Sequence, residues 1–149
     1  MAALTASKKN PKYGAGNTMV LGLSLPMKAS TKIYNGAMVA IDASGNAMPA
    51  DLLAGGTVRV IGVADAEVDN SSGAAAAKSI PVRRGAFVFK NSTAGDAITK
   101  AEVGSAVYCV DDQTVAKTSA TGTRALAGIC IGLDDNGSDV IVEVGVHLS

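Results

Sequence analysis

Short apolar runs alternate with polar clusters along most of this 149-residue chain. The runs are rich in Val, Ile and Ala, and the clusters between them are rich in Gly, Asn, Asp and Ser. Many short strands with closely spaced turn signals are typical of sandwiches and barrels rather than of alternating strands and helices. We therefore predict an all-β fold: a small antiparallel β-barrel or β-sandwich with an extended N-terminal arm and at most one short helix.

Most of the predicted strands end at a recognisable turn. Gly85 separates two apolar runs and predicts a bulge or tight bend between them. The clusters at 111–113 and 134–137 each separate two runs and predict hairpins, and Asn136-Gly137 tolerates the positive φ angles of a tight turn. The predicted strands cover residues 34–41, 57–64, 80–84, 86–89, 107–110, 114–117, 127–133 and 140–146.

Helical signals are few. Thr99 and Glu102 have capping-box spacing, which predicts a single helical turn over residues 100–103. The Ala-rich stretch at 72–78 is compatible with a short helix, but an alanine run between polar residues also occurs in long loops. Helices therefore add little to the predicted fold.

The chain contains a faint internal repeat. Residues 35–42 (NGAMVAID) resemble residues 104–111 (GSAVYCVD), and a Gly-containing apolar strand follows each, at 60–64 and 127–131. Two related halves of one barrel would produce this pattern. Chance similarity in a chain rich in Ala, Gly and Val is the alternative.

The N-terminal residues differ from the rest of the chain. Residues 1–18 are polar, carry three lysines and show no periodic apolar pattern. We expect an extended arm that either orders on a partner or frays as a free terminus. The predicted organisation is therefore an N-terminal arm with the first strand at 1–32 and a β-barrel or β-sandwich domain at 33–149.

Composition and charge exclude several classes of protein. Hydrophobic residues make up 48% of the chain but aromatic residues only 3%, so the core consists mainly of small aliphatic side chains and association is expected to add stability. Acidic and basic residues balance at 13 each, so we expect no general attraction to nucleic acid. No apolar run approaches the length of a membrane span, so we expect no membrane insertion.

The two cysteines give no sign of redox or metal chemistry. Cys109 and Cys130 lie in apolar runs and lack CxxC spacing. We expect buried, reduced thiols that pack as small hydrophobic side chains, with a disulfide between them as the alternative.

No catalytic motif is recognisable. The phosphate-binding P-loop and the nucleophile elbow are absent, and His147 stands without a neighbouring acid or cysteine. The aspartate pairs at 111–112 and 134–135 occupy predicted turns, where backbone preferences explain them. We expect no enzyme, no cofactor and no metal; a hydrolase with dispersed residues around His147 is the alternative.

Three blocks of strand and turn residues follow one another in a characteristic order. They are 36–42 (GAMVAID) with 60–65 (VIGVAD), then 80–89 (IPVRRGAFVF), then 98–112 (ITKAEVGSAVYCVDD) with 126–132 (LAGICIG) and 140–144 (VIVEV). In this order they resemble the capsid cement, or head decoration, proteins of tailed bacteriophages, formerly a domain of unknown function. An older label of that family, RecA/RadA-like phage recombinase, requires Walker A residues that this chain lacks.

The resemblance implies a virion protein with a β-tulip-like barrel. It would be made in the host cytoplasm and would bind the outer surface of the assembled head, bridging neighbouring subunits of the major capsid protein. It would self-associate as a homotrimer, or alternatively as a homodimer. We expect the N-terminal arm to contact the capsid through Lys8, Lys9, Lys12 and Tyr13, by adding a strand to a sheet edge.

The alternative from another functional class is a small β-barrel module that binds carbohydrate or a host surface. Such modules stack sugars on exposed aromatic rings. Tyr13, Tyr34 and Tyr108 are the candidates, since Phe87 and Phe89 are expected in the core.

Overall fold

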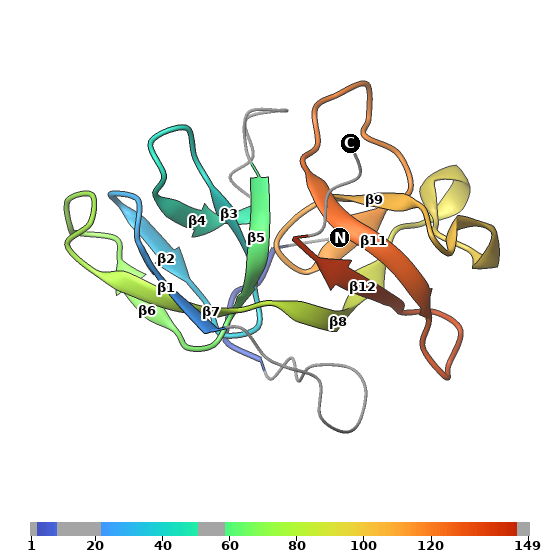
Figure 1. The fold of residues 1–149 in the computed structure, drawn as a ribbon, viewed down its shortest axis with the longest axis horizontal. Helices are drawn as coiled ribbons and strands as arrows, with labels where there is room; N and C mark the ends of the chain where they lie inside the picture. Colours follow the sequence, from blue (N-terminus) through green and yellow to red (C-terminus); the bar gives the residue numbers. More distant parts are fainter. Residues whose placement is uncertain (1–2, 9–21, 51–58, 146–149) are drawn as a thin grey trace.

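The computed structural model describes residues 3–8, 22–50 and 59–145, and β-strands dominate these ranges (Figure 1). The predicted all-β class is confirmed. Two single-turn 3-10 helices accompany the strands, η3 (Ala94–Asp96) and η4 (Lys100–Glu102). The strands are β1 (Gly22–Pro26), β2 (Thr31–Ile33), β3 (Met38–Ile41), β4 (Ala47–Pro49), β5 (Arg59–Ala64), β6 (Val68–Asn70), β7 (Ser79–Arg83), β8 (Gly85–Asn91), β9 (Ala106–Cys109), β10 (Thr114–Ala116), β11 (Leu126–Leu133) and β12 (Val140–Val144).

Two five-stranded units follow one another along the chain with the same strand order. The first unit is the sheet β1-β7-β5-β3-β4, and the second unit is the barrel β8-β12-β11-β9-β10. A parallel pairing of β10 with β8 closes the barrel. At the corresponding place in the first unit, Met27 and Ala47 form an isolated parallel bridge. The repeat in the sequence therefore marks two similar units, rather than two halves of one barrel.

One pair of glycines occupies corresponding positions in the two units. Gly62 in β5 and Gly128 in β11 both lie where the register of the sheet shifts. A Cβ on Gly62 would lie 2.5 Å from the carbonyl oxygen of Arg83, and a Cβ on Gly128 would overlap the carbonyl oxygen of Glu143. At both positions a residue without a side chain lets the next strand, β7 or β12, approach closely.

A second pair of glycines precedes corresponding strands. Gly36 before β3 has φ 89°, and Gly104 before β9 has φ 87°. A turn at Gly36 therefore splits the predicted strand at 34–41, and β3 begins only at Met38. Glycine suits both turns because it adopts positive φ without steric cost.

The first unit is buried on both faces of its sheet. Alternate residues of β3 point to opposite faces, as the two-residue period of a strand requires, so Val39 belongs to one core cluster and Met38 and Ala40 to the other. The first cluster fills the first unit with side chains such as Ile80 and Val82. The second cluster joins the outer face of the sheet to barrel residues that include Phe87 and Phe89. The two units therefore share a core.

Strands β7 and β8 carry the chain from the first unit into the second. Gly85 is the first residue of β8 and has φ 143°, at the bend that the sequence predicts. On either side of this crossover, Arg83 forms an ion pair with Asp65 at 2.9 Å, and Arg84 Nη2 donates to the carbonyl oxygen of Gly145 at 2.8 Å. Both arginines therefore bind within the chain and fasten the crossover.

A small two-stranded sheet, β2 with β6, covers the first unit. The buried side chain of Asn70 donates to the carbonyl oxygens of Lys28 and Ala74, both at 3.0 Å. The backbone N–H of Ala76 donates to the carbonyl oxygen of Met27 at 2.8 Å. These bonds hold residues 72–78 in turns, so the short helix considered for this stretch does not form.

Candidate functional site

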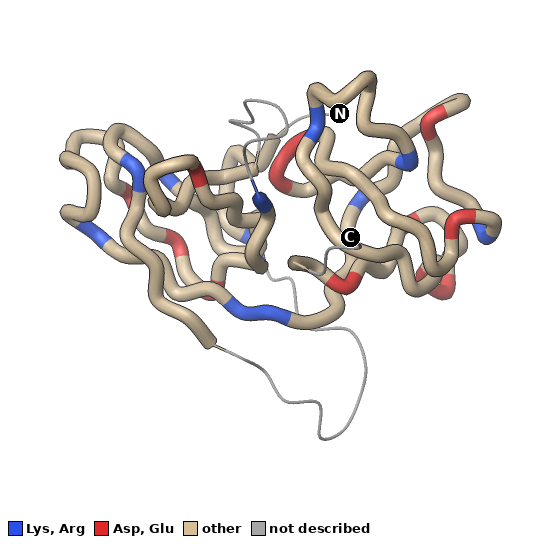
Figure 2. Tube along the Cα trace, turned by 45° about the horizontal axis from the view of Figure 1, so that its top comes forward, with Lys and Arg blue, Asp and Glu red and all other residues tan. Residues whose placement is uncertain are grey.

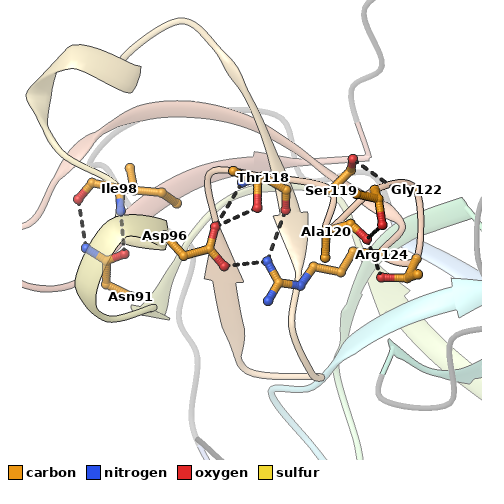
Figure 3. A network of polar contacts seen from close by, with 10 residues as sticks. Asn91, Asp96, Ile98, Thr118, Ser119, Ala120, Gly122 and Arg124 are labelled. Carbon is orange, nitrogen blue, oxygen red and sulfur yellow. Dashed lines mark hydrogen bonds and ion pairs between the residues drawn. The ribbon is translucent and has the colours of Figure 1, made fainter.

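Two loops of the second unit are tied together by the side chains of Asp96 and Arg124 (Figure 3). We call residues 92–105, between β8 and β9, and residues 117–125, between β10 and β11, the apical loops. Arg124 Nη1 lies 2.6 Å from Asp96 Oδ2 and also donates to the carbonyl oxygen of Thr118 at 3.1 Å. The Thr118 hydroxyl donates to Asp96 Oδ1 at 2.7 Å. One carboxylate therefore organises both loops.

The first apical loop has its own internal fastening. The side chain of Asn91, at the end of β8, donates to the carbonyl oxygen of Ile98 and accepts from its N–H, both at 2.8 Å (Figure 3). The Ile98 side chain is buried in the second core cluster. Beyond it, the side chains of Thr99 and Glu102 form the capping box that the sequence predicts. Side-chain bonds thus hold this loop at both of its turns.

Backbone conformations also indicate a rigid apex. Ala94, Ala120 and Thr121 have φ of 55°, 48° and 58°. Non-glycine residues adopt this left-handed region at a cost, and they persist where the surrounding bonds determine the conformation. In the second loop those bonds include Thr123 Oγ1 to the carbonyl oxygen of Ala120 at 2.8 Å.

The acidic groups of the apex are held in their charged form. Hydrogen bonds from Arg124 and Thr118 lower the pKa of Asp96, and those from the backbone and side chain of Thr99 lower the pKa of Glu102. The hydrogen bonds that lower these pKa values are the same ones that fasten the apical loops.

An apolar pair is exposed beside this fastened region. Among the described residues, Val103 and Ile131 are the exposed large hydrophobic side chains, at 50% and 45%. The N–H of Gly104 donates to the carbonyl oxygen of Cys130 at 2.7 Å, and the N–H of Cys130 donates to that of Ser105 at 3.0 Å. These bonds join residues 104–105 to Cys130. Val103 precedes Gly104 in the chain and Ile131 follows Cys130, so each exposed side chain lies next to a bonded residue. We call Val103 and Ile131 the apical apolar pair.

The residues predicted to contact a capsid are placed only in part. Lys8 is half-buried, and its ammonium donates to Gln113 Oε1 at 3.3 Å. Burial, followed by the nearby charge of Lys90, lowers the pKa of Lys8. Lys8 is therefore engaged within the chain, while Lys9, Lys12 and Tyr13 lie outside the described residues, as does His147.

The cysteines are buried in the fold, and the aspartate at the turn after β9 binds a backbone N–H. Cys109 and Cys130 are free and buried, as predicted, and burial raises the pKa of both thiols. Asp111 accepts the N–H of Gln113 at 2.9 Å, as expected for an aspartate that forms a turn.

In the described part of the chain, no group of three or more His, Cys, Asp or Glu side chains is placed to hold a metal ion. None of the helices described here is long and apolar enough to cross a membrane.

Little of this apex is recognisable in the sequence. The spacing of Thr99 and Glu102 predicts their capping box, but no pattern predicts the Asp96–Arg124 ion pair or the apical apolar pair. Asp96 and Arg124 are 28 residues apart, and no local pattern links them.

Comparisons of the chain with family models, with curated proteins and with solved structures found no match.

Proposed function

We propose that this chain is a capsid decoration protein, which binds the outer surface of an assembled bacteriophage head and bridges neighbouring major capsid protein subunits. The order of the three sequence blocks between residues 36 and 144 supports this proposal. The structural observation that carries it is an apex fastened by the Asp96–Arg124 ion pair, with the exposed apolar pair Val103 and Ile131 beside it.

The apical loops suit binding to a large, repetitive surface. A loop that is fastened before binding loses little conformational freedom when a partner covers it. Val103 and Ile131 offer apolar area for such a contact, and truncating a central contact residue costs about 1–3 kcal/mol. Each single contact is then modest, but a protein that grips several subunits at once gains affinity from effective concentration.

The described aromatic residues do not favour the carbohydrate-binding alternative. Phe87 and Phe89 are buried in the core. The Lys32 ammonium lies 4.7 Å from the centre of the Tyr34 ring and covers one of its faces. A sugar would have to displace this lysine to stack on that face, and Tyr108, the other described tyrosine, is half-buried in β9. We therefore propose no glycan-binding role.

Co-sedimentation with heads that lack this chain tests the proposal. The heads come from the phage that encodes the chain, and the test variant is Val103→Asp with Ile131→Asp. We expect the wild-type chain to sediment with expanded heads and the variant to bind about tenfold more weakly or worse. Ser72→Asp with Ala75→Asp, exposed in the first unit, is the matched control and should bind as wild type does.

Each outcome of this experiment decides a different point. If the wild-type chain does not sediment with heads, the proposed function is wrong. If the wild-type chain and the apical variant bind equally well, the contact surface lies elsewhere on the molecule. Circular dichroism and thermal unfolding confirm that each variant is folded before its binding is compared.

The predicted contact through the arm is tested separately. Replacing Lys9, Lys12 and Tyr13 with Ala leaves the contacts of Lys8 intact. A weaker association with heads would support the arm as a second contact. Unchanged binding would remove it from the proposal.

A further inference from the structure

Residues 3–8 lie across both units of the fold. We call this segment the N-terminal strap; it is drawn in dark blue near the junction of the units in Figure 1. Leu4 packs against the core cluster of the first unit. Its backbone N–H donates to Asp112 Oδ1, in the second unit, at 2.8 Å, and the Asp112 residue is only 2% exposed. One residue of the strap thus contacts both units.

The rest of the strap is held by specific polar contacts. Ser7 Oγ donates to Glu67 Oε1 at 2.6 Å and accepts the N–H of Asn35 at 3.1 Å. The N–H of Lys8 donates to the carbonyl oxygen of Asn35 at 2.9 Å, and its ammonium reaches Gln113 of the second unit. The surface beneath the strap is therefore a binding site for one short peptide, with partners for its backbone and its side chains.

Opposite net charges also favour binding of the N-terminal segment to the second unit. Residues 1–21 carry three lysines and no acidic residue, whereas residues 85–149 carry eight acidic and four basic residues. Several acidic positions of the second unit are visible in Figure 2. Burial and the charge of Lys90 act against the Lys8 ammonium and lower its pKa, while Asp112, Asp139 and Asp111 attract it. The basic N-terminal segment and the acidic second unit are complementary.

The strap is joined to the body by a long connection. Thirteen residues, 9–21, separate Lys8 from β1, and a chain of that length spans at most about 45 Å. The strap of one molecule can therefore reach the same surface on a neighbour. If two molecules exchanged their straps, each contact would be replaced by an identical one between molecules. Such exchange becomes favourable when the local concentration of neighbouring molecules exceeds the effective concentration of the strap within its own chain, which is of about millimolar order.

We propose that the surface beneath the strap is a site for a second copy of this chain, which inserts its own residues 3–8 when copies are crowded together. The site consists of Asn35, Glu67, Asp112 and Gln113 with the apolar surface under Leu4. The partner is a basic N-terminal peptide identical to the one bound in the structure. This proposal does not depend on head binding.

Cysteine cross-linking between single variants tests strap exchange. Ser7→Cys and Glu67→Cys replace two side chains in direct contact, and both native thiols are buried in the folded chain. One variant carries a size tag, and the two are mixed at rising concentration and oxidised mildly. We expect a disulfide-linked dimer that contains both variants, roughly tenfold more abundant at the highest concentration than for the control mixture of Ser7→Cys with Ser138→Cys.

Two further variants make the result decisive. The double variant Ser7→Cys with Glu67→Cys, at low concentration, must close within one chain, which establishes that the pair can cross-link. Leu4→Asp should reduce the mixed dimer, because it removes the apolar anchor of the strap. The proposal is overturned if the double variant closes but the mixed singles give no more dimer than the control at any concentration.

Discussion

Arg124 Nη1 lies 2.6 Å from Asp96 Oδ2, and this contact joins the two apical loops of the second unit. Both side chains are about three-quarters buried, with 21% and 26% of their surface exposed. The ion pair is shielded from solvent more than a typical surface pair, whose contribution to stability is small. It therefore fixes the shape of the apex that the proposed function requires.

We expect Arg124→Met to lower the free energy of unfolding by about 1–2 kcal/mol. The substitution keeps much of the aliphatic stem but leaves Asp96 without its charged partner. Urea unfolding measures the loss. A double-mutant cycle with Asp96→Asn should give a coupling energy of about 1 kcal/mol. Additive effects of the two substitutions would contradict a direct interaction.

The same carboxylate predicts a pH dependence. The pKa of Asp96 is lower in the folded chain than in the unfolded chain, where it is near 3.9. Its contribution to stability is then fully present above pH 4 to 5 and is lost as the pH falls through the folded-state pKa. We expect the stability difference between wild type and Asp96→Asn to shrink between pH 6 and pH 3. A difference that stays constant over this range would show that the Asp96 charge does not stabilise the fold.

The corresponding glycines Gly62 and Gly128 predict that an alanine at either position lowers the free energy of unfolding. Gly128→Ala and Gly62→Ala should each cost about 3 kcal/mol or more, because the new Cβ meets the carbonyl oxygen of the next strand. Gly132→Ala is the control on β11, since the nearest atom to its Cβ is a side-chain methyl of Ile141 at 3.9 Å. Thermal unfolding compares the three. A cost at Gly132 equal to that at Gly128 would contradict close strand approach as the cause.

The buried thiols predict slow chemical modification. Burial raises the pKa of Cys109 and Cys130, so little reactive thiolate forms near neutral pH. We expect a thiol reagent to label the native chain much more slowly than the chain unfolded in guanidinium chloride, where both cysteines should react. Rapid labelling of one thiol under native conditions would show that its strand opens readily.

Local sequence patterns were sufficient to predict the strand-rich class, both C-terminal hairpins, the bend at Gly85 and the turn after Thr99. Each depends on residues close together in the chain, whose backbone preferences act over a few positions. The strand predicted at 34–41 was too long, because the turn at Gly36 depends partly on a hydrogen bond from its N–H to the carbonyl oxygen of Ala64, in the neighbouring strand β5. The alanine run at 72–78 failed to become helical because Asn70 and Met27 bind that segment.

The sequence by itself determined that this chain forms short strands with small aliphatic cores, and its faint repeat indicated two related parts. Only the tertiary structure decided that these parts are two five-stranded units with one strand order and a shared core. It alone brought Arg124 to Asp96 and Leu4 to Asp112, since packing places side chains that are far apart in sequence next to each other. Such contacts carry no local signature, because the energy that forms them comes from the whole fold rather than from neighbouring residues.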